Sequence, residues 1–190
     1  MPRVLILAVR QVPSMKWFKN IFSAKTAHEN PGETMTSQEL GDYLFGMCVR
    51  WVGSFLDIWE ESIKKRGLGS ASRDSINKVE LLIAFMWSCF DLLQEEKYLD
   101  SLTRMHGRFR QHMNELNLDP NEMWRLLQVR YDEYLQSHRA EGKVDFTYKR
   151  AAWKISENIY DGPDVLLEFQ VTISLQKIVL HIGQNIKKQK

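Results

Sequence analysis

Residues 79–93 read VELLIAFMWSCFDLL, and this stretch decides the fold. Wound as an α-helix, it is apolar around most of its circumference, and its polar residues form only a narrow strip. A helix at a protein surface is apolar along one side, whereas a helix that is apolar on nearly all sides is buried. We therefore predict a helix over about residues 73–97 that lies at the centre of a bundle.

Other segments show the spacing of amphipathic helices. The segment that starts at Thr36 opens with a capping box, Thr36-Ser37-Gln38-Glu39, and then carries apolar residues three and four positions apart as far as Ser62. Asp119-Pro120-Asn121-Glu122 marks a further helix start. Helices are also predicted over about residues 99–117 and 145–160.

The C-terminal segment is ambiguous between helix and strand. Leu167 to Gln176 alternates apolar and polar residues, which is typical of a strand, but residues 165–182 also show helical spacing. Length favours the helix, because strands usually run about 5–6 residues. The predicted fold is all-α, an irregular or up-and-down bundle of about six helices, with β structure over residues 165–182 as the open alternative.

Domain organisation follows from one linker. Residues 24–35 are small and polar around Pro31-Gly32, as in a connecting segment. We predict an N-terminal extension and linker over residues 1–35 and a single helical domain over residues 36–190. Residues 1–14 precede a natural start at Met15, so they are interpreted either as an over-extended gene start or as a short strand.

Composition indicates an ordinary globular protein, with 44% hydrophobic residues, 26% charged residues and a net charge of +2. The two cysteines, Cys48 and Cys89, lie in apolar helical patterns, which favours buried free thiols over disulfides and predicts a cytoplasmic protein. The longest unbroken apolar run, Leu81 to Trp87, falls far short of the roughly 20 residues of a membrane span. We therefore expect no transmembrane segment.

Motifs for chemistry are missing from the sequence. None of the five histidines has the spacing of a helical metal site, and neither a phosphate-binding loop nor a nucleophile elbow occurs. We predict no metal and no cofactor. Whether the protein is an enzyme stays open, because catalytic groups can come together in space.

The polar side of the first long helix is one candidate binding site. Gly46 and Gly53 lie on it, seven residues apart, and glycine destabilises a helix interior by about 1 kcal/mol relative to alanine. Such a pair indicates that another backbone or a ligand approaches, with a tolerated exposed glycine as the alternative. The predicted binding residues are Asp42, Gly46, Arg50, Gly53 and Asp57.

Residues 16–25 form a second candidate, an amphipathic anchor. Trp17, Phe18, Ile21 and Phe22 can gather on one side of a short helix, with lysines around the other side. This pattern suits a peripheral membrane contact or a groove on a partner protein. The alternative is a terminal helix that docks on the bundle itself.

A third candidate is basic. Arg104, Arg108 and His112 share one helical face and could lie along phosphates. Asp100 and Glu115 flank them, so a salt-bridged face is the simpler interpretation and nucleic acid is not the expected partner.

We accordingly expect a non-catalytic interaction protein, such as an adaptor, regulator or assembly factor, that uses a helix face to bind a protein partner or itself. The alternative is a small-ligand-binding or enzymatic helical bundle with a pocket near the second helix. A buried polar cluster around Glu80, Ser88 and Asp91 that lines a concave pocket would favour this alternative. A weak nucleic-acid binder is the third interpretation.

Overall fold

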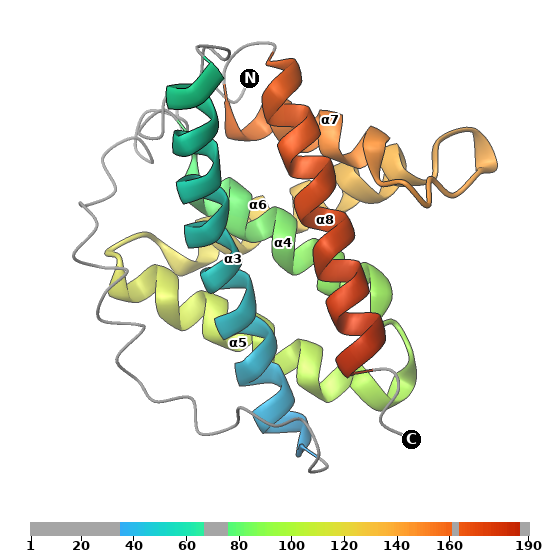
Figure 1. Cartoon of the computed structure of the whole chain (residues 1–190). Coiled ribbons are helices and arrows are strands. Elements are labelled where there is room, and N and C mark those ends of the chain that lie inside the picture. Colours follow the sequence, from blue (N-terminus) through green and yellow to red (C-terminus); the bar gives the residue numbers. More distant parts are fainter. Residues whose placement is uncertain (1–34, 67–75, 161–163, 187–190) are drawn as a thin grey trace.

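The computed structural model describes residues 35–66, 76–160 and 164–186, and these ranges contain α- and 3-10 helices but no strand (Figure 1). The all-α prediction is confirmed for this part of the chain. The elements, in chain order, are α3 (Ser37–Arg66), α4 (Lys78–Leu92), η2 (Glu96–Tyr98), α5 (Leu99–Glu115), α6 (Pro120–His138), η3 (Ala140–Gly142), α7 (Lys149–Ile159) and α8 (Val165–Asn185).

The helix starts are set by side chains that accept hydrogen bonds from otherwise unpaired amides. At α3 the predicted capping box forms: the Thr36 amide donates to Glu39 Oε2 (2.9 Å), and the Glu39 amide donates to Thr36 Oγ1 (3.3 Å). At α6, Asp119 Oδ1 accepts from the Asn121 amide at 2.8 Å. The predictions at both starts are confirmed.

The central helix is shorter than the predicted range of 73–97. Asn77 caps α4, because its Oδ1 accepts from the amides of Val79 (3.1 Å) and Glu80 (3.2 Å). At the other end, Glu95 adopts an extended conformation (φ −67°, ψ 142°) that ends the helical path before α5 begins. Residues 94–97 are good helix formers by propensity, so only the fold of the chain separates α4 from α5.

The C-terminal segment is a helix, and the β alternative for residues 165–182 is not supported. Asp164 Oδ1 accepts from the amides of Leu166 (3.1 Å) and Leu167 (3.0 Å) and so starts α8. The buried side chains then follow helical spacing: Leu167, Val171, Ser174, Leu175, Ile178 and Ile182. The period-2 alternation misled because several of its apolar residues are on the outside of the helix.

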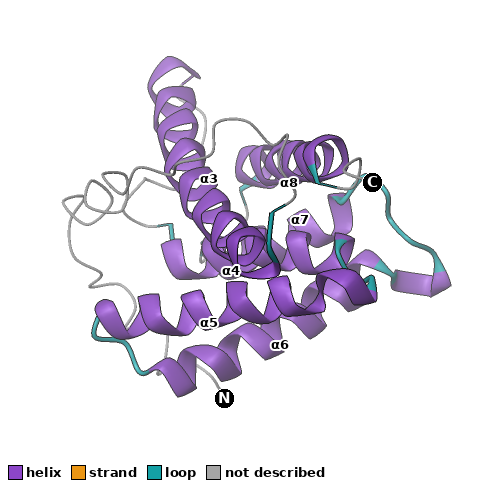
Figure 2. Ribbon diagram, turned by 90° about the horizontal axis from the view of Figure 1, so that it is seen from below, coloured by secondary structure: helices purple, strands orange, loops and turns teal. Residues whose placement is uncertain are grey.

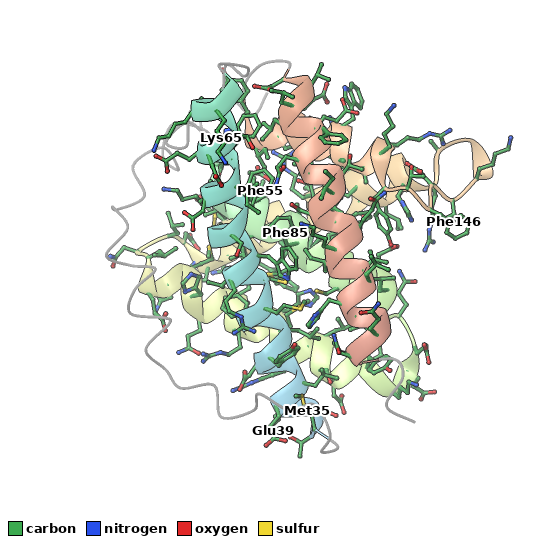
Figure 3. The ribbon with its side chains drawn as sticks, in the orientation of Figure 1. Met35, Glu39, Phe55, Lys65, Phe85 and Phe146 are labelled. Carbon is green, nitrogen blue, oxygen red and sulfur yellow. The ribbon has the colours of Figure 1, made fainter. Side chains whose placement is uncertain are left out.

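The helices are arranged around α4, as the central prediction required. α4 packs against α3, α6, α7 and α8, while α3 also crosses α5. Figure 2 shows α5 and α6 lying side by side, with α4 between this pair and α8. The largest fully buried side chains include Trp59, Trp87 and Phe109, and Phe55 of α3 meets Phe85 of α4 edge to face at 6.2 Å (Figure 3).

α8 also has the length and composition of a membrane-spanning helix. Its mean hydropathy over 18 residues is 1.4, and 33% of that window is buried. The sequence contains no unbroken apolar run at α8, because charged residues such as Glu168 and Lys177 interrupt it. Core helices of soluble proteins meet the same criterion. Unlike a typical core helix, α8 has a large part of its surface uncovered.

Candidate functional site

Exposed apolar side chains concentrate at the C-terminal end of the described chain. Nine large apolar side chains are exposed in the described residues, and six of them lie between residues 144 and 180. Figure 3 shows that the segment carrying Phe146 projects away from the bundle. We call these six residues the α7–α8 surface: Val144, Phe146, Trp153, Val165, Phe169 and Leu180.

The centre of this surface is the outer face of α8. Val165, Phe169 and Leu180 are 79%, 60% and 59% exposed. With the partly buried Ile173 they follow spacings of four, four and seven residues, which places them along one side of the helix. The opposite side of α8 is buried, so the exposed stripe is not a consequence of fraying or of a loose helix.

α7 lies beside this stripe and runs antiparallel to it. α7 ends six residues before α8 begins, and Gln176 Nε2 of α8 donates to the Thr147 carbonyl oxygen, 3.1 Å away, just before α7 starts. On α7, Trp153 lies midway between the loop to α8 and the hydrogen bond at Thr147. On α8, Phe169 and its neighbours lie midway between the same loop and Gln176. The exposed indole of Trp153 is therefore at the same height along the helix pair as the exposed Phe169 ring.

Exposed lysines lie on both helices that carry these apolar side chains. Residues 143–160 and 164–186 carry five Lys and Arg against four Asp and Glu. Lys154 pairs with Glu157 at 3.3 Å, but Lys149 and Lys177 are exposed and form no ion pair among the described residues. The α7–α8 surface is thus an apolar stripe with two lysines that are unpaired in the described part of the chain, Lys149 and Lys177, in the helices that carry it.

The predicted binding face on α3 carries side chains that are already engaged with neighbours. Asp42 holds Arg104 through two hydrogen bonds (2.8 and 3.0 Å), and the Arg50 guanidinium lies 5.9 Å from the Tyr43 ring centroid. A methyl group added at Gly46 would meet only Arg50 Nη1, at 3.7 Å. Among the described residues no other backbone approaches Gly46, and binding of a ligand or partner at this face stays a prediction.

The remaining two residues of this predicted face lie further along α3. Gly53 is partly buried and Asp57 is exposed. The role of the five residues as a binding site stays a prediction.

The glycine that permits a close approach is Gly41, which sequence reasoning missed. A Cβ atom at Gly41 would lie 2.5 Å from Arg104 Cβ and 2.6 Å from the Ser101 carbonyl oxygen, so α5 crosses α3 at this point. A signal was available: Gly41 is on the same side as Leu44 and Cys48, the buried side of α3. A glycine on an apolar face indicates close packing more strongly than one on a polar face.

The predicted basic face is divided between two environments. Arg104 and Arg108 both point to Asp42, with Arg108 Nε 3.5 Å from its carboxylate. His112 is buried against Phe45, and burial lowers its pKa. These three side chains do not form a continuous positive strip. The predicted anchor of Trp17, Phe18, Ile21 and Phe22 lies outside the described residues.

The polar residues of α4 do not form a single cluster. Glu80 accepts from Arg130 Nε at 2.8 Å, and the Ser88 hydroxyl donates to the Phe85 carbonyl oxygen at 2.7 Å. Asp91 lies in the last turn of α4. Its Oδ2 is 3.5 Å from His138 Nε2 and accepts a hydrogen bond from the Tyr148 hydroxyl at 3.4 Å. These three side chains therefore have separate partners and do not form the buried polar cluster that would favour a pocket near α4.

The surroundings of Asp91 are nevertheless unusual. Trp87 Nε1 and His138 Nδ1 are buried and form no hydrogen bond within the described residues. Tyr148 stacks on His138 with ring centroids 4.6 Å apart, and it adopts a left-handed conformation (φ 59°) that bulky residues rarely occupy. Burial also lowers the pKa of His138, although Asp91 opposes this shift.

Metal binding gains no support from the described residues, which contain no group of three His, Cys, Asp or Glu side chains suited to hold an ion. Comparisons with protein-family models, with curated proteins and with solved structures found no match.

Proposed function

We propose that this protein is a non-catalytic interaction protein, an adaptor, regulator or assembly factor, that binds a protein partner through the α7–α8 surface. The observation that carries the proposal is the outer face of α8, where Val165, Phe169 and Leu180 are each more than half exposed on a helix whose opposite side is buried. Contiguous exposed apolar surface with a polar border is characteristic of interaction sites.

The partner that fits this surface is a helix with an apolar face and acidic flanks. A stripe with the width of one helix matches the way an amphipathic helix packs against another protein. Lys149 of α7 and Lys177 of α8 would face carboxylates, which favours encounter and orientation. A second copy of this chain fits less well, because two-fold symmetry places the same cations on both sides of the interface.

The test compares two sets of substitutions. The double variant Phe169→Ala/Leu180→Ala removes the centre of the stripe, and Val129→Ala removes an equally exposed apolar side chain from α6 as the matched control. Each tagged protein is used for affinity capture from native lysate with quantitative mass spectrometry. We expect a defined set of proteins that is lost with the double variant and retained with the control.

Other results would contradict the proposal. Retention of every captured protein by the double variant would show that the stripe is ordinary surface. Light scattering that gives a dimer only for the stripe-bearing protein would assign the surface to self-association. Binding to vesicles containing anionic lipid, lost in the same variant, would assign it to a membrane surface.

Small-ligand binding near α4 is the second candidate function, and a specific observation favours it. Buried polar atoms are nearly always paired, so the unpaired Trp87 Nε1 and His138 Nδ1 would suit a small polar ligand. Native mass spectrometry of the purified protein tests this: a retained small molecule, lost on Trp87→Phe, is the expected result. Because Arg104 and Arg108 share the Asp42 carboxylate, no comparable observation favours the nucleic-acid interpretation.

A further inference from the structure

The two cysteines of the chain, 41 residues apart in sequence, meet in the core. Cys48 Sγ of α3 lies 3.6 Å from Cys89 Sγ of α4, and both side chains are fully buried. The sequence alone indicates two separate buried thiols, because nothing in the local pattern around either residue points to the other.

The contact between the thiols is part of a fixed register between the two helices. Seven residues after Cys48, Phe55 of α3 packs on Phe85 of α4, which is four residues before Cys89. The two contacts advance along α3 and go backwards along α4, so the helices run antiparallel past each other here (Figure 3). A disulfide has a sulfur–sulfur distance of about 2.05 Å, so the two sulfurs need to approach by about 1.5 Å.

We propose that Cys48 and Cys89 form a site of reversible oxidation, at which the dithiol is converted to a disulfide that links α3 to α4. The oxidant required is a small-molecule disulfide such as oxidised glutathione. This inference rests on residues and helices other than the α7–α8 surface and does not depend on the proposed function.

The reaction consists of two thiol–disulfide exchanges. In the first, the thiolate of one cysteine attacks a glutathione sulfur, and the glutathione disulfide bond breaks to release one glutathione thiolate. In the second, the thiolate of the other cysteine attacks the protein sulfur of the mixed disulfide and releases the second glutathione. Two electrons pass from the protein sulfurs to glutathione, and the two protein thiol protons end on the two glutathione molecules.

Burial makes the exchange slow and selective. Burial raises the pKa of Cys48, and a neutral thiol is a poor nucleophile. Reaction therefore requires a transient separation of α3 from α4 that admits the oxidant. Once one sulfur has reacted, closure of the helices brings the second sulfur back beside it, which favours the intramolecular bond over a lasting glutathione adduct.

The test follows the full-length folded protein in glutathione buffers of increasing oxidised fraction. Thiols are quenched with acid and alkylated, and intact mass is measured without reductant. We expect a species lighter by two hydrogen atoms that carries no alkyl group, and that reverts with dithiothreitol. Because the link restrains the unfolded chain, the melting temperature of this species should be higher by about 5–10 °C.

Cys48→Ala and Cys89→Ala are the matched controls, and in each the remaining cysteine should show no mass loss and no increase in melting temperature on oxidation. Wild-type protein provides a control that does not depend on how these variants fold: in denaturant, both thiols should accept glutathione. The proposal is overturned if the native protein keeps two alkylatable thiols at every glutathione ratio, or forms only glutathione adducts or intermolecular dimers.

Discussion

α4 and α8 are both rich in apolar residues, yet only α4 is enclosed. Eleven of the fifteen residues of α4 are buried, in an unbroken run from Val79 to Cys89. Only six of the twenty-one residues of α8 are buried. α4 has α3, α6, α7 and α8 around it, whereas α8 packs against α4 and α7 and, over a shorter stretch, α3.

The difference shows that apolar composition and burial are separate properties. The stabilisation from an apolar side chain depends on the area that other atoms remove from water. On α4 neighbouring helices remove that area on every side. On the outer face of α8 nothing in the described chain does so, and the same kind of side chain is left available for a partner.

The largest effect should come from the same substitution made in both helices. Phe85→Ala on α4 should lower the free energy of unfolding by about 3–5 kcal/mol, because Phe85 is fully buried and leaves a cavity. Phe169→Ala on α8 should change it by no more than about 0.5 kcal/mol, since that ring is 60% exposed. Urea denaturation of both variants provides the measurement. Equal losses would show that the outer face of α8 is covered.

A somewhat smaller loss is expected when the buried charge on α4 loses its partner. Glu80 is almost completely buried and is held by Arg130 Nε and Nη2. Arg130→Ala should cost about 3 kcal/mol, because it leaves a buried carboxylate without its main counter-charge. Arg125→Ala, at an exposed position of α6, serves as the control and should be nearly neutral.

A second substitution tests the cause. Replacing both partners, as in Glu80→Leu/Arg130→Met, should recover much of the lost stability, because an apolar pair needs no desolvation of charge. If the double variant is as unstable as Arg130→Ala, the loss comes from packing of the arginine side chain rather than from the unpaired carboxylate.

Lowering the pH should destabilise the enclosed part of the fold through His106. Its ring lies beside Phe90 of α4 and Trp124 of α6, and burial lowers its pKa from 6.5 to about 4. Between these two values the unfolded chain binds more protons than the folded one, so stability falls as the pH falls. The loss at pH 4 relative to pH 7 is about 3 kcal/mol.

Variants separate this histidine from the others. His106→Gln should remove a large part of the stability change between pH 7 and pH 4, measured by thermal melts at constant ionic strength. His181→Gln, on the only partly buried side of α8, should remove less. A pH profile unchanged by His106→Gln would assign the effect to other groups.

The smallest effects are expected at two glycines of α3. Gly41→Ala should destabilise the protein by about 1–3 kcal/mol, because the new methyl group has no room beside Ser101 and Arg104 of α5. Gly46→Ala should stabilise it by about 0.4–1 kcal/mol, because there is open space and the unfolded chain becomes less flexible. Differential scanning calorimetry of both variants measures the change in melting temperature. The change should be negative for Gly41→Ala and positive for Gly46→Ala, and two changes of the same sign would contradict this prediction.

Several features could be predicted from the sequence because their causes are local. The Thr36 and Asp119 caps join residues within three positions of each other, and helical periodicity is a property of one segment. The central position of α4 also followed from its sequence, because a helix that is apolar on all sides has no other stable place. The end of α4 near Glu95 was missed, since local propensity alone would continue the helix.

The candidate sites were harder to predict because their parts are distant in sequence. Asp42 and Arg104 belonged to two separate predictions, and the structure joins them in one ion pair across 62 residues. Cys48 and Cys89 were likewise considered separately. The place of Gly41 on the apolar side of α3 could have indicated a close contact. The sequence could not show that the helix in contact with Gly41 is α5.

The sequence by itself determined that the described part of this chain is helical, where two of its helices start, and that residues 79–93 lie at the centre of the bundle. These properties follow from hydrogen bonds and periodicities within a few residues. Only the tertiary structure decided that α8 is covered on one side, that two arginines of α5 share one carboxylate of α3, and that two thiols meet between α3 and α4. Exposure and pairing depend on which helices lie against each other, and that is a property of the whole fold.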